Sequence, residues 1–347
     1  MIPALAIARE LRDKHGAEVR FVGTARGFEA RLVPQAGFGL ETIEVGQLKG
    51  VSLKTRLRTL LDLPLGVRRC LRILRSFQPQ VVVGVGGYAS GPGMMAALLH
   101  RTPTLAFEPN AVPGLANRLV GRWVSAAAVS FPPTCGYFRN AEVTGIPVRQ
   151  EFFALPPRAP QSPPNLLVFG GSQGARVFNN SMPKIVVALL EAIPGLTILH
   201  QAGARQAEST QAAYAESGAD PNRWQVAAFL EDMPARFAAA DLVLARSGAS
   251  TVAELGAAGK PSLLVPFPQA ADDHQRSNAE VMVKTGGARM LLEPDLTDEK
   301  LLDCLVELLA DQARLRRVGA DARRLARPDA AERIAIKVAS LAAGYAK

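Results

Sequence analysis

Residues 165–175 read Asn-Leu-Leu-Val-Phe-Gly-Gly-Ser-Gln-Gly-Ala, and this stretch decides the fold. The short apolar run at 166–169 predicts a buried parallel strand. Glycines and polar residues follow it, and a helical pattern opens at Ala175. Such a turn leaves unpaired N–H groups at a helix N-terminus, and glycine lets a bulky anion approach them. The turn therefore favours phosphate binding, with a ligand-free strand-to-helix turn as the alternative.

Length and composition indicate a soluble, intracellular protein with two domains. The chain has 347 residues, enough for two cores, and 48% of them are hydrophobic. Its cysteines, Cys70, Cys135 and Cys304, match no metal or redox spacing, which favours a reducing compartment. No apolar run approaches the ~20 residues that a membrane span needs, and the sequence has no signal peptide.

The positive charge is concentrated in the first half of the chain. The net charge is +9 overall. Residues 1–150 carry 19 Lys and Arg against 9 Asp and Glu, whereas residues 151–347 carry 21 against 22. The asymmetry predicts two domains with different partners.

Helix and strand patterns alternate in both halves, which predicts two βαβ-type domains. The prolines of residues 156–164 predict a stiff linker. We expect an N-terminal domain over 1–150, a linker over 151–164, a C-terminal domain over 165–328, and a last helix over 329–347 that returns toward the first domain. In the first half the expected helices are 4–15, 52–62, 66–77 and 91–100, and the expected strands are 19–22, 42–45, 81–85, 104–107, 124–129 and 142–144. In the second half the expected strands are 166–169, 196–200, 224–229, 241–245, 262–265 and 288–292.

The beginning of the chain departs from this pattern. The first three residues lead directly into the helix at 4–15, with Pro3 suited to its first turn. In a doubly wound domain a central strand and a loop precede that helix. Either this domain is unusual or about a dozen residues are lacking. Loss of a central strand exposes its neighbours' edges, so we expect reduced stability.

Two further segments follow strands of the second domain. Residues 246–254 read Arg-Ser-Gly-Ala-Ser-Thr-Val-Ala-Glu. Here Thr251 and Glu254 have the spacing of a capping box, while the hydroxyls and amides of the segment suit a diphosphate and Glu254 suits ribose hydroxyls. Residues 266–279 form a polar loop that suits sugar hydroxyls, with a capped, solvated loop as the alternative. Both lie where α/β sheets bind ligands.

The first domain contains a glycine-rich loop at 84–93, after the strand at 81–85. It suits a second phosphate group. With Glu108 it also imitates a dinucleotide fingerprint, although the third glycine is missing. An NAD-linked oxidoreductase therefore remains an alternative at this point.

A basic, leucine-rich segment covers residues 51–77. Its leucines have helical spacing, so a core contact is the default interpretation. Its arginines also suit an anionic membrane surface. We expect no nucleic-acid partner, because aromatic residues and a reading motif are lacking.

Four ordered motifs, at 86–93, 170–175, 247–254 and 266–279, resemble the MurG family of bacterial glycosyltransferases along the whole chain. The resemblance implies an α/β, GT-B type fold with two Rossmann-like doubly wound domains facing across a cleft. It implies transfer of N-acetylglucosamine from UDP-GlcNAc to the 4-hydroxyl of MurNAc in lipid I, undecaprenyl-pyrophosphoryl-MurNAc-pentapeptide. The product is lipid II for peptidoglycan. A UDP-GlcNAc 2-epimerase is the alternative with the same fold.

The resemblance also implies site residues. Donor contacts would come from Asn110, Arg149, Ser172, Leu230, Ala249, Ser250, Thr251, Val252, Ala253, Glu254 and Gln275, with Asn110 and Arg149 reaching the donor from the opposite side of the cleft. Acceptor contacts would come from Gly86, Gly87, Tyr88, Ser90 and Gly91. The basic segment would place the protein on the cytoplasmic face of the inner membrane.

Members of this family begin with a strand and a GGTGGH loop, whose histidine is the proposed general base, and this chain begins at the residue after it. Glu108 is the nearest remaining carboxylate, so we assign it as the candidate catalytic residue. No Asp-x-Asp pair ends a strand, so we expect neither a metal nor a cofactor. Helix N-termini and Arg149 would then stabilise the departing diphosphate.

Overall fold

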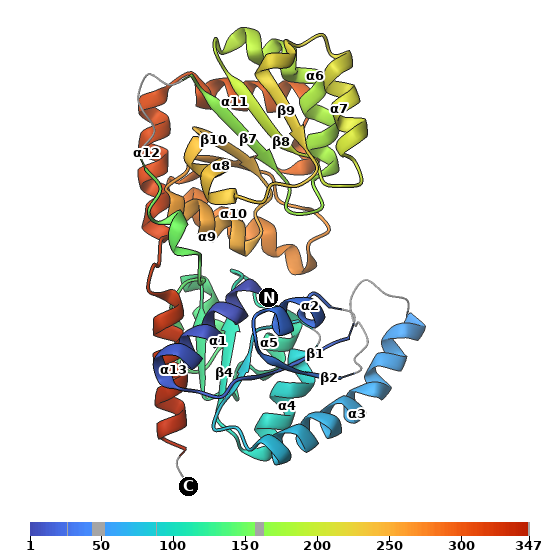
Figure 1. Cartoon of the computed structure of the whole chain (residues 1–347), viewed down its shortest axis with the longest axis vertical. Helices are drawn as coiled ribbons and strands as arrows, with labels where there is room; N and C mark the ends of the chain where they lie inside the picture. The colour runs from blue at the N-terminus through green and yellow to red at the C-terminus, as the bar shows by residue number, and fades with distance from the viewer. Residues whose placement is uncertain (26, 44–52, 88, 157–162, 346–347) are drawn as a thin grey trace. The chain divides into compact units, whose positions relative to one another are not determined.

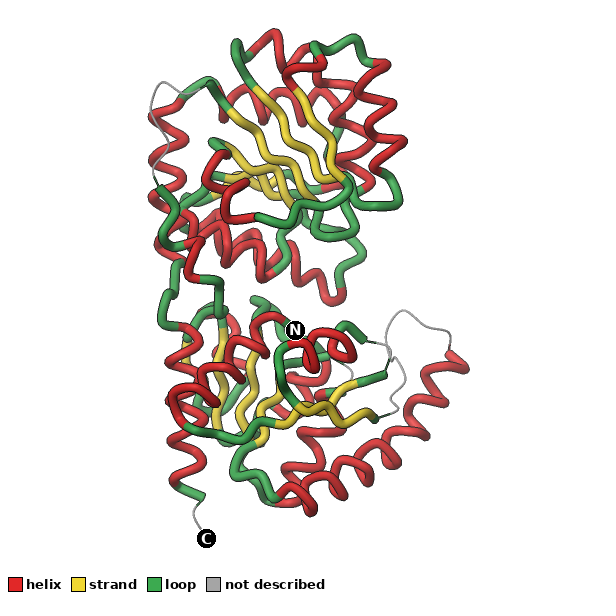
Figure 2. The backbone as a smooth tube through the Cα atoms, in the orientation of Figure 1, coloured by secondary structure: helices red, strands yellow, loops and turns green. Residues whose placement is uncertain are grey.

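The computed structural model describes residues 1–25, 27–43, 53–87, 89–156 and 163–345. It divides into two compact units (Figures 1 and 2). Unit 1 comprises residues 1–147 and 327–347, and unit 2 comprises residues 148–326. The first unit was expected to end at residue 150, but it ends at residue 147, so residues 148–150 belong to unit 2. The C-terminal helix packs within unit 1.

Unit 2 is built on one parallel sheet of six strands in the order β12-β11-β10-β7-β8-β9. The order reverses between β7 and β10, the first and fourth strands of the unit, so the sheet is doubly wound. Its strands are β7 (Asn165–Phe169), β8 (Thr197–Gln201), β9 (Trp224–Ala227), β10 (Leu242–Ala245), β11 (Ser262–Leu264) and β12 (Ala288–Met290). Each lies within two residues of its predicted position.

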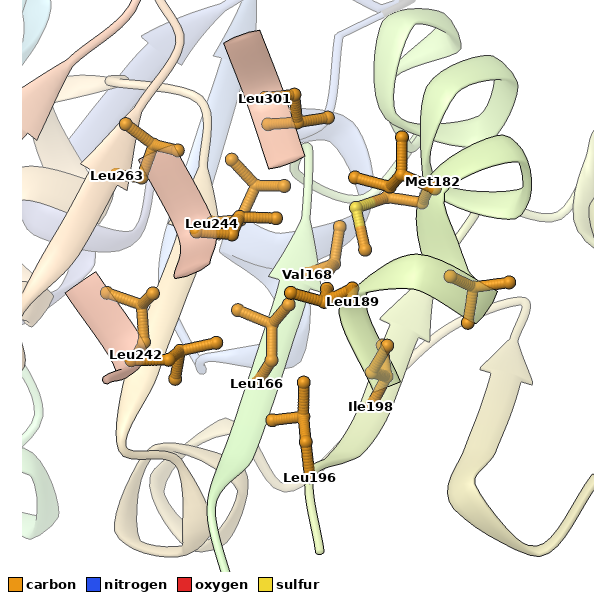
Figure 3. Close-up of a cluster of buried hydrophobic side chains, with 14 of the residues drawn as sticks. Leu166, Val168, Met182, Leu189, Leu196, Ile198, Leu242, Leu244, Leu263 and Leu301 are labelled. Carbon is orange, nitrogen blue, oxygen red and sulfur yellow. The ribbon is translucent and has the colours of Figure 1, made fainter. Parts of the chain in front are cut away.

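The helices of unit 2 lie on both faces of this sheet (Figure 1). They are α6 (Arg176–Ala192), α7 (Ala207–Glu216), α8 (Met233–Ala239), α9 (Ala249–Ala258), α10 (His274–Lys284), α11 (Asp298–Leu309) and α12 (Gln312–Ala322). The main core lies between the sheet, α6 and α11, where Val168, Met182 and Leu301 are buried (Figure 3). Removing such area from water provides most of the stabilisation of the unit.

The sheet of unit 1 is in two parts. Strands β1 (Arg20–Gly23) and β2 (Gly39–Thr42) form one parallel pair. Strands β3 (Val82–Gly84), β4 (Thr104–Glu108), β5 (Ala126–Val129) and β6 (Ala141–Val143) form a second parallel sheet. Its helices are α1 (Ile2–His15), α2 (Glu29–Gln35), α3 (Leu53–Phe77), α4 (Ser90–His100), α5 (Leu115–Val120) and α13 (Ala330–Ala343).

A cavity of about 490 Å³ separates β1 from β3. Residues 19–22 and 81–85 line it from the two sheets, and α1, α3, α4 and α13 contribute the rest of its wall. In the strand order of a doubly wound domain, a central strand belongs between β1 and β3. The split sheet therefore agrees with the expectation, drawn from the helix at 4–15, that this domain departs from the usual pattern.

Helix α13, at the end of the chain, packs within unit 1 on two sides. Helix α13 packs against α1. On its other side, Arg333 and Lys337 donate hydrogen bonds of 2.8 Å and 2.6 Å to the two carboxylate oxygens of Glu142 at β6. These contacts lower the pKa of Glu142, because both cations favour its ionised form.

Two sequence-based element assignments in unit 1 are wrong in detail. The helices expected at 52–62 and 66–77 form the single helix α3, which contains Pro64. Pro64 lacks the N–H that would donate one hydrogen bond within the helix. The helix nevertheless continues through it, because its apolar face packs against α4. The strand expected at 42–45 lies at residues 39–42, and residues 44–45 are outside the described residues.

The unpaired edges at the cavity predict that unit 1 opens before unit 2. In hydrogen exchange, amides of β1 and β3 should lose protection at lower denaturant than those of β7 and β10, because only one neighbour holds each edge strand. Peptides from α6 provide the internal reference. Equal protection of the four strands would contradict this expectation.

Candidate functional site

The glycine-rich turn lies at the carboxyl end of β7, as predicted. Gly174 N–H donates a 2.9 Å hydrogen bond to Gly171 O, which closes the turn. Helix α6 follows with Ala175 at the N-cap and no side-chain cap. The first amides of α6 have no acceptor within the helix, and Ser172 is exposed beside them. The turn offers an anion several N–H donors.

A second helix N-terminus lies at the carboxyl end of β10, next to β7 in the sheet. Helix α9 begins at Ala249, and its N-cap is Gly248, which has no side chain to cap it. The capping box expected for Thr251 and Glu254 is therefore wrong, because the helix starts earlier than that motif requires. Instead the amides of Ala249, Ser250 and Thr251 are first-turn donors, while Val252 N–H already bonds Gly248 O at 3.0 Å.

Arg246 and Gln275 build the wall beside α9. The Arg246 guanidinium donates to the carbonyls of Val265 and Pro266, both at 3.1 Å, and pairs with Glu293. The Gln275 amide oxygen accepts a 3.0 Å hydrogen bond from Phe267 N–H. These contacts fix the loop after β11, so Gln275 is held at the site where the sequence places a sugar contact.

Glu254 and Arg149 interact on unit 2. Partial burial raises the pKa of Glu254 to about 7, and the positive charge of Arg149 opposes this rise. Arg149 is exposed and stacks on the Phe152 ring, 5.2 Å from its centroid. The sequence predicts Arg149 at the end of the N-terminal domain. It lies in unit 2, because the chain enters that unit at Val148.

Leu230 is buried, and its main chain is hydrogen-bonded to Gln201, which was not among the site residues predicted from the sequence. Its N–H donates a 3.1 Å hydrogen bond to the side-chain oxygen of Gln201, the last residue of β8. The signal for Gln201 was a polar residue at the carboxyl end of an apolar strand. Asn179 of α6, which is hydrogen-bonded to Ala202 and Gln206, was also not predicted. Nothing in the sequence signals it, since an asparagine inside a helix resembles a surface residue.

In unit 1, Glu108, the predicted catalytic residue, is buried and hydrogen-bonded to the segment that follows it. It is 2% exposed. One carboxylate oxygen accepts from Asn110 N–H and Asn110 Nδ2, at 3.0 Å and 3.1 Å. The other accepts from Gly114 N–H and Asn117 Nδ2, both at 3.0 Å. With four donors around it, the carboxylate orients Asn110 and the following turn rather than receiving a substrate proton.

The loop at 86–91 joins β3 to α4 close to this network. Gly86 and Gly87 have φ of +80° and +82°, and a Cβ on Gly86 would lie 3.7 Å from Asn117 Nδ2. Among the described residues, Ser90 Oγ and Asn117 Oδ1 are buried and have no hydrogen-bond partner. Gly91 lies in the first turn of α4, and Tyr88 is outside the described residues. The loop has the polar groups expected of an anion site.

Two α/β units with parallel sheets, one of them doubly wound with helix N-termini at its strand-order reversal, have the architecture of the GT-B glycosyltransferases. Residues 1–129 match the glycosyltransferase family 28 N-terminal domain, and residues 165–334 match its C-terminal domain. The chain belongs to glycosyltransferase family 28.

Named relatives support this assignment. The chain is 46% identical to the UDP-N-acetylglucosamine–N-acetylmuramyl-(pentapeptide) pyrophosphoryl-undecaprenol N-acetylglucosamine transferase of Solibacter usitatus, over 96% of this chain and 91% of that one. It is 42% identical to the Magnetococcus marinus protein of the same name, over 98% and 94%. The crystal structure of Acinetobacter baumannii MurG matches with a TM-score of 0.79 and 31% identity, over 97% and 95%.

A solved putative UDP-N-acetylglucosamine 2-epimerase from Listeria monocytogenes matches with a TM-score of 0.69 but 13% identity, over 97% of this chain and 92% of that one. This likeness shows the shared fold alone. The family match therefore favours a transferase over the epimerase and oxidoreductase alternatives.

The raised pKa of Glu254 predicts a pH-dependent stability. A folded pKa of about 7 lies above the ordinary 4.5, so ionisation costs stability as pH rises through this interval, and the full cost is present above pH 7. Glu254→Gln should therefore stabilise unit 2 at pH 8 by about 2–3 kcal/mol and have little effect at pH 4.5. Thermal unfolding at both pH values measures this, with exposed Glu208→Gln as the control. A Glu254→Gln effect equal at both pH values would refute it.

Proposed function

We propose that this chain transfers N-acetylglucosamine from UDP-N-acetylglucosamine to the 4-hydroxyl of MurNAc in undecaprenyl-pyrophosphoryl-MurNAc-pentapeptide. The 46% identity to a relative of that name, over 96% of the chain, carries the proposal. The geometry of unit 2 supports it, because two uncapped helix N-termini end neighbouring strands there.

The donor is bound by unit 2 in this proposal. The diphosphate lies against Ser172 and the first amides of α6 and α9, where the helix dipoles favour negative charge. Glu254 accepts hydrogen bonds from the ribose hydroxyls, Leu230 meets the uracil, and Gln275 meets the sugar. Neighbouring Ala249, Ser250, Thr251, Val252 and Ala253 form the wall of the phosphate and ribose pocket.

The acceptor's 4-hydroxyl attacks the anomeric carbon and its proton passes to solvent, while the bond to the diphosphate breaks with its electron pair leaving on UDP. The configuration inverts to a β-1,4 link. Negative charge grows on UDP as it leaves, so fixed N–H dipoles and Arg149 stabilise the transition state more than the ground state. Unit 1 takes the acceptor pyrophosphate at Gly86, Gly87, Ser90 and Gly91, and Glu108 holds Asn110 in place for the donor sugar.

UDP release tests the proposed activity. With a soluble lipid I analogue, the full chain should release UDP and form the disaccharide product, detected by mass spectrometry. Arg149→Met should lower kcat/KM by about hundredfold to thousandfold, the range for removing one preorganised donor that stabilises transition-state charge. Arg205→Met, an exposed arginine of the same unit, is the control. Absence of product from the wild-type chain would refute the proposed function.

A membrane-facing surface on unit 1 fits a lipid acceptor. Apolar side chains of α3, α4, α5 and the segment after α5 are exposed: Leu65, Leu99, Leu115, Leu119 and Trp123. Exposed arginines alternate with them at 68, 69, 72, 118 and 122, and α4 packs against both α3 and α5. The side chains of Lys49, Lys54, Arg56 and Arg58 are outside the described residues.

Apolar side chains flanked by cations bind anionic bilayers by insertion and charge attraction. No helix in the described part of the chain is long and apolar enough to cross a membrane. We therefore propose peripheral binding to the cytoplasmic face of the bacterial inner membrane.

Vesicle sedimentation tests this surface. Leu119→Glu and Trp123→Glu should each reduce binding to phosphatidylglycerol-containing vesicles by about tenfold, because each removes buried apolar area and adds a repelled charge. Exposed Val283→Glu on unit 2 is the matched control. If the three variants bind alike, this surface does not contact the membrane.

A further inference from the structure

A single buried amide connects two segments of unit 2 that the proposed function places at opposite ends of UDP. Gln201, at the carboxyl end of β8, is 3% exposed. Its Nε2 donates a 2.8 Å hydrogen bond to Gly171 O in the glycine-rich turn. Its Oε1 accepts a 3.1 Å hydrogen bond from Leu230 N–H. One rigid group therefore spans the turn and the segment after β9.

The backbone around Gln201 is packed too closely to shift alone. Gly174 and Gly203 have φ of +72° and +84°. A Cβ on Gly174 would overlap the Ala202 carbonyl, and a Cβ on Gly203 would overlap the Gln173 carbonyl. The turn after β7 and the turn after β8 thus lie in direct backbone contact, which only glycine allows at these two positions.

Asn179 of α6 is hydrogen-bonded to the turn after β8. This residue is 5% exposed, and its Nδ2 donates to Ala202 O and to Gln206 Oε1, both at 2.9 Å. The turn after β8 is consequently anchored to α6 on one side and joined to Gly171 and Leu230 by Gln201 on the other. The Nδ2 group of Asn179 thus holds the turn after β8 against α6 through two buried hydrogen bonds, while its Oδ1 is buried without a partner among the described residues.

We propose that Gln201 is a positioning residue that sets the separation between the diphosphate-binding turn and the uracil-binding segment. The proposal rests on the proposed function. UDP must contact both segments at once, and its affinity depends on their being held at the correct distance before it binds. Without the amide, each segment keeps its own fold but their spacing is no longer fixed.

Gln201 also affects base selection. The N–H of Leu230 is donated to Gln201, so under this proposal the Leu230 carbonyl is the main-chain group left for a base. A carbonyl accepts from the N3–H of uracil and repels the N3 lone pair of cytosine. Gln201 should therefore favour UDP over CDP.

Isothermal titration of the full chain with UDP and with CDP tests both consequences. Gln201→Met, similar in size but without donor or acceptor, should weaken UDP binding at least tenfold and reduce the ratio of UDP to CDP affinity. Gln201→Glu keeps an acceptor for Leu230 N–H but has no donor for Gly171 O, so UDP binding should weaken here too. Gln225→Met, an exposed glutamine on β9, should bind UDP as the wild type does.

Hydrogen exchange of the wild-type chain provides a test that needs no variant. Inorganic pyrophosphate occupies the diphosphate subsite at α6 and α9 and has no base to contact Leu230, so it should slow exchange at the glycine-rich turn and, through Gln201, also at the Leu230 amide. Protection of the turn with unchanged exchange at Leu230 would overturn the proposal. UDP binding within twofold of wild type in either folded Gln201 variant would also overturn it.

These outcomes are distinct from failure of the proposed function. A wild-type chain that binds no UDP refutes the function itself. A wild-type chain that binds UDP, together with Gln201 variants that bind it equally well, leaves the function in place and removes only the role of Gln201.

Discussion

The order of strands in unit 2 is the constraint on which the rest of the site depends. A parallel sheet that reverses its order between β7 and β10 leaves their carboxyl ends adjacent, with helices departing to opposite faces. Both helices, α6 and α9, begin without side-chain caps. Two sets of unpaired amides are thereby concentrated where one polyanion can satisfy both. Capping either helix with its own side chain would stabilise the free protein and occupy the donors that the ligand needs.

Much of this arrangement could be predicted from the sequence because it depends on local signals. The apolar run before Gly170 and the glycines after it determine a strand and a turn whatever surrounds them, and all six strands of unit 2 were located in this way. The capping box at Thr251 failed because helix starts depend on where the preceding strand ends. Gln201 and Asn179 could not be found, because their importance lies in contacts with segments 30 and 23 residues distant.

In unit 1, the position of Glu108 could be predicted from the sequence, but its hydrogen-bond partners could not. Glu108 was chosen from the sequence as the nearest remaining carboxylate, and the structure places it at the end of β4. Its role depends on four donors from the following nine residues, which no spacing rule predicts. A carboxylate surrounded in this way is an anchor for the loop that carries Asn110.

The charge balance at Glu254 connects the stability of the fold to ligand binding. Burial favours a neutral carboxyl, whereas Arg149 favours an ionised one. A ribose that donates hydrogen bonds to this carboxyl adds to the effect of Arg149, so the ligand provides what the free protein lacks. In the same way, the proposed ligand would accept hydrogen bonds from the first amides of the two uncapped helices. At Leu230, where Gln201 takes the N–H, it would donate to the carbonyl. In the proposed function, a uridine diphosphate would supply polar partners to the first amides of α6 and α9, to Glu254 and to Leu230.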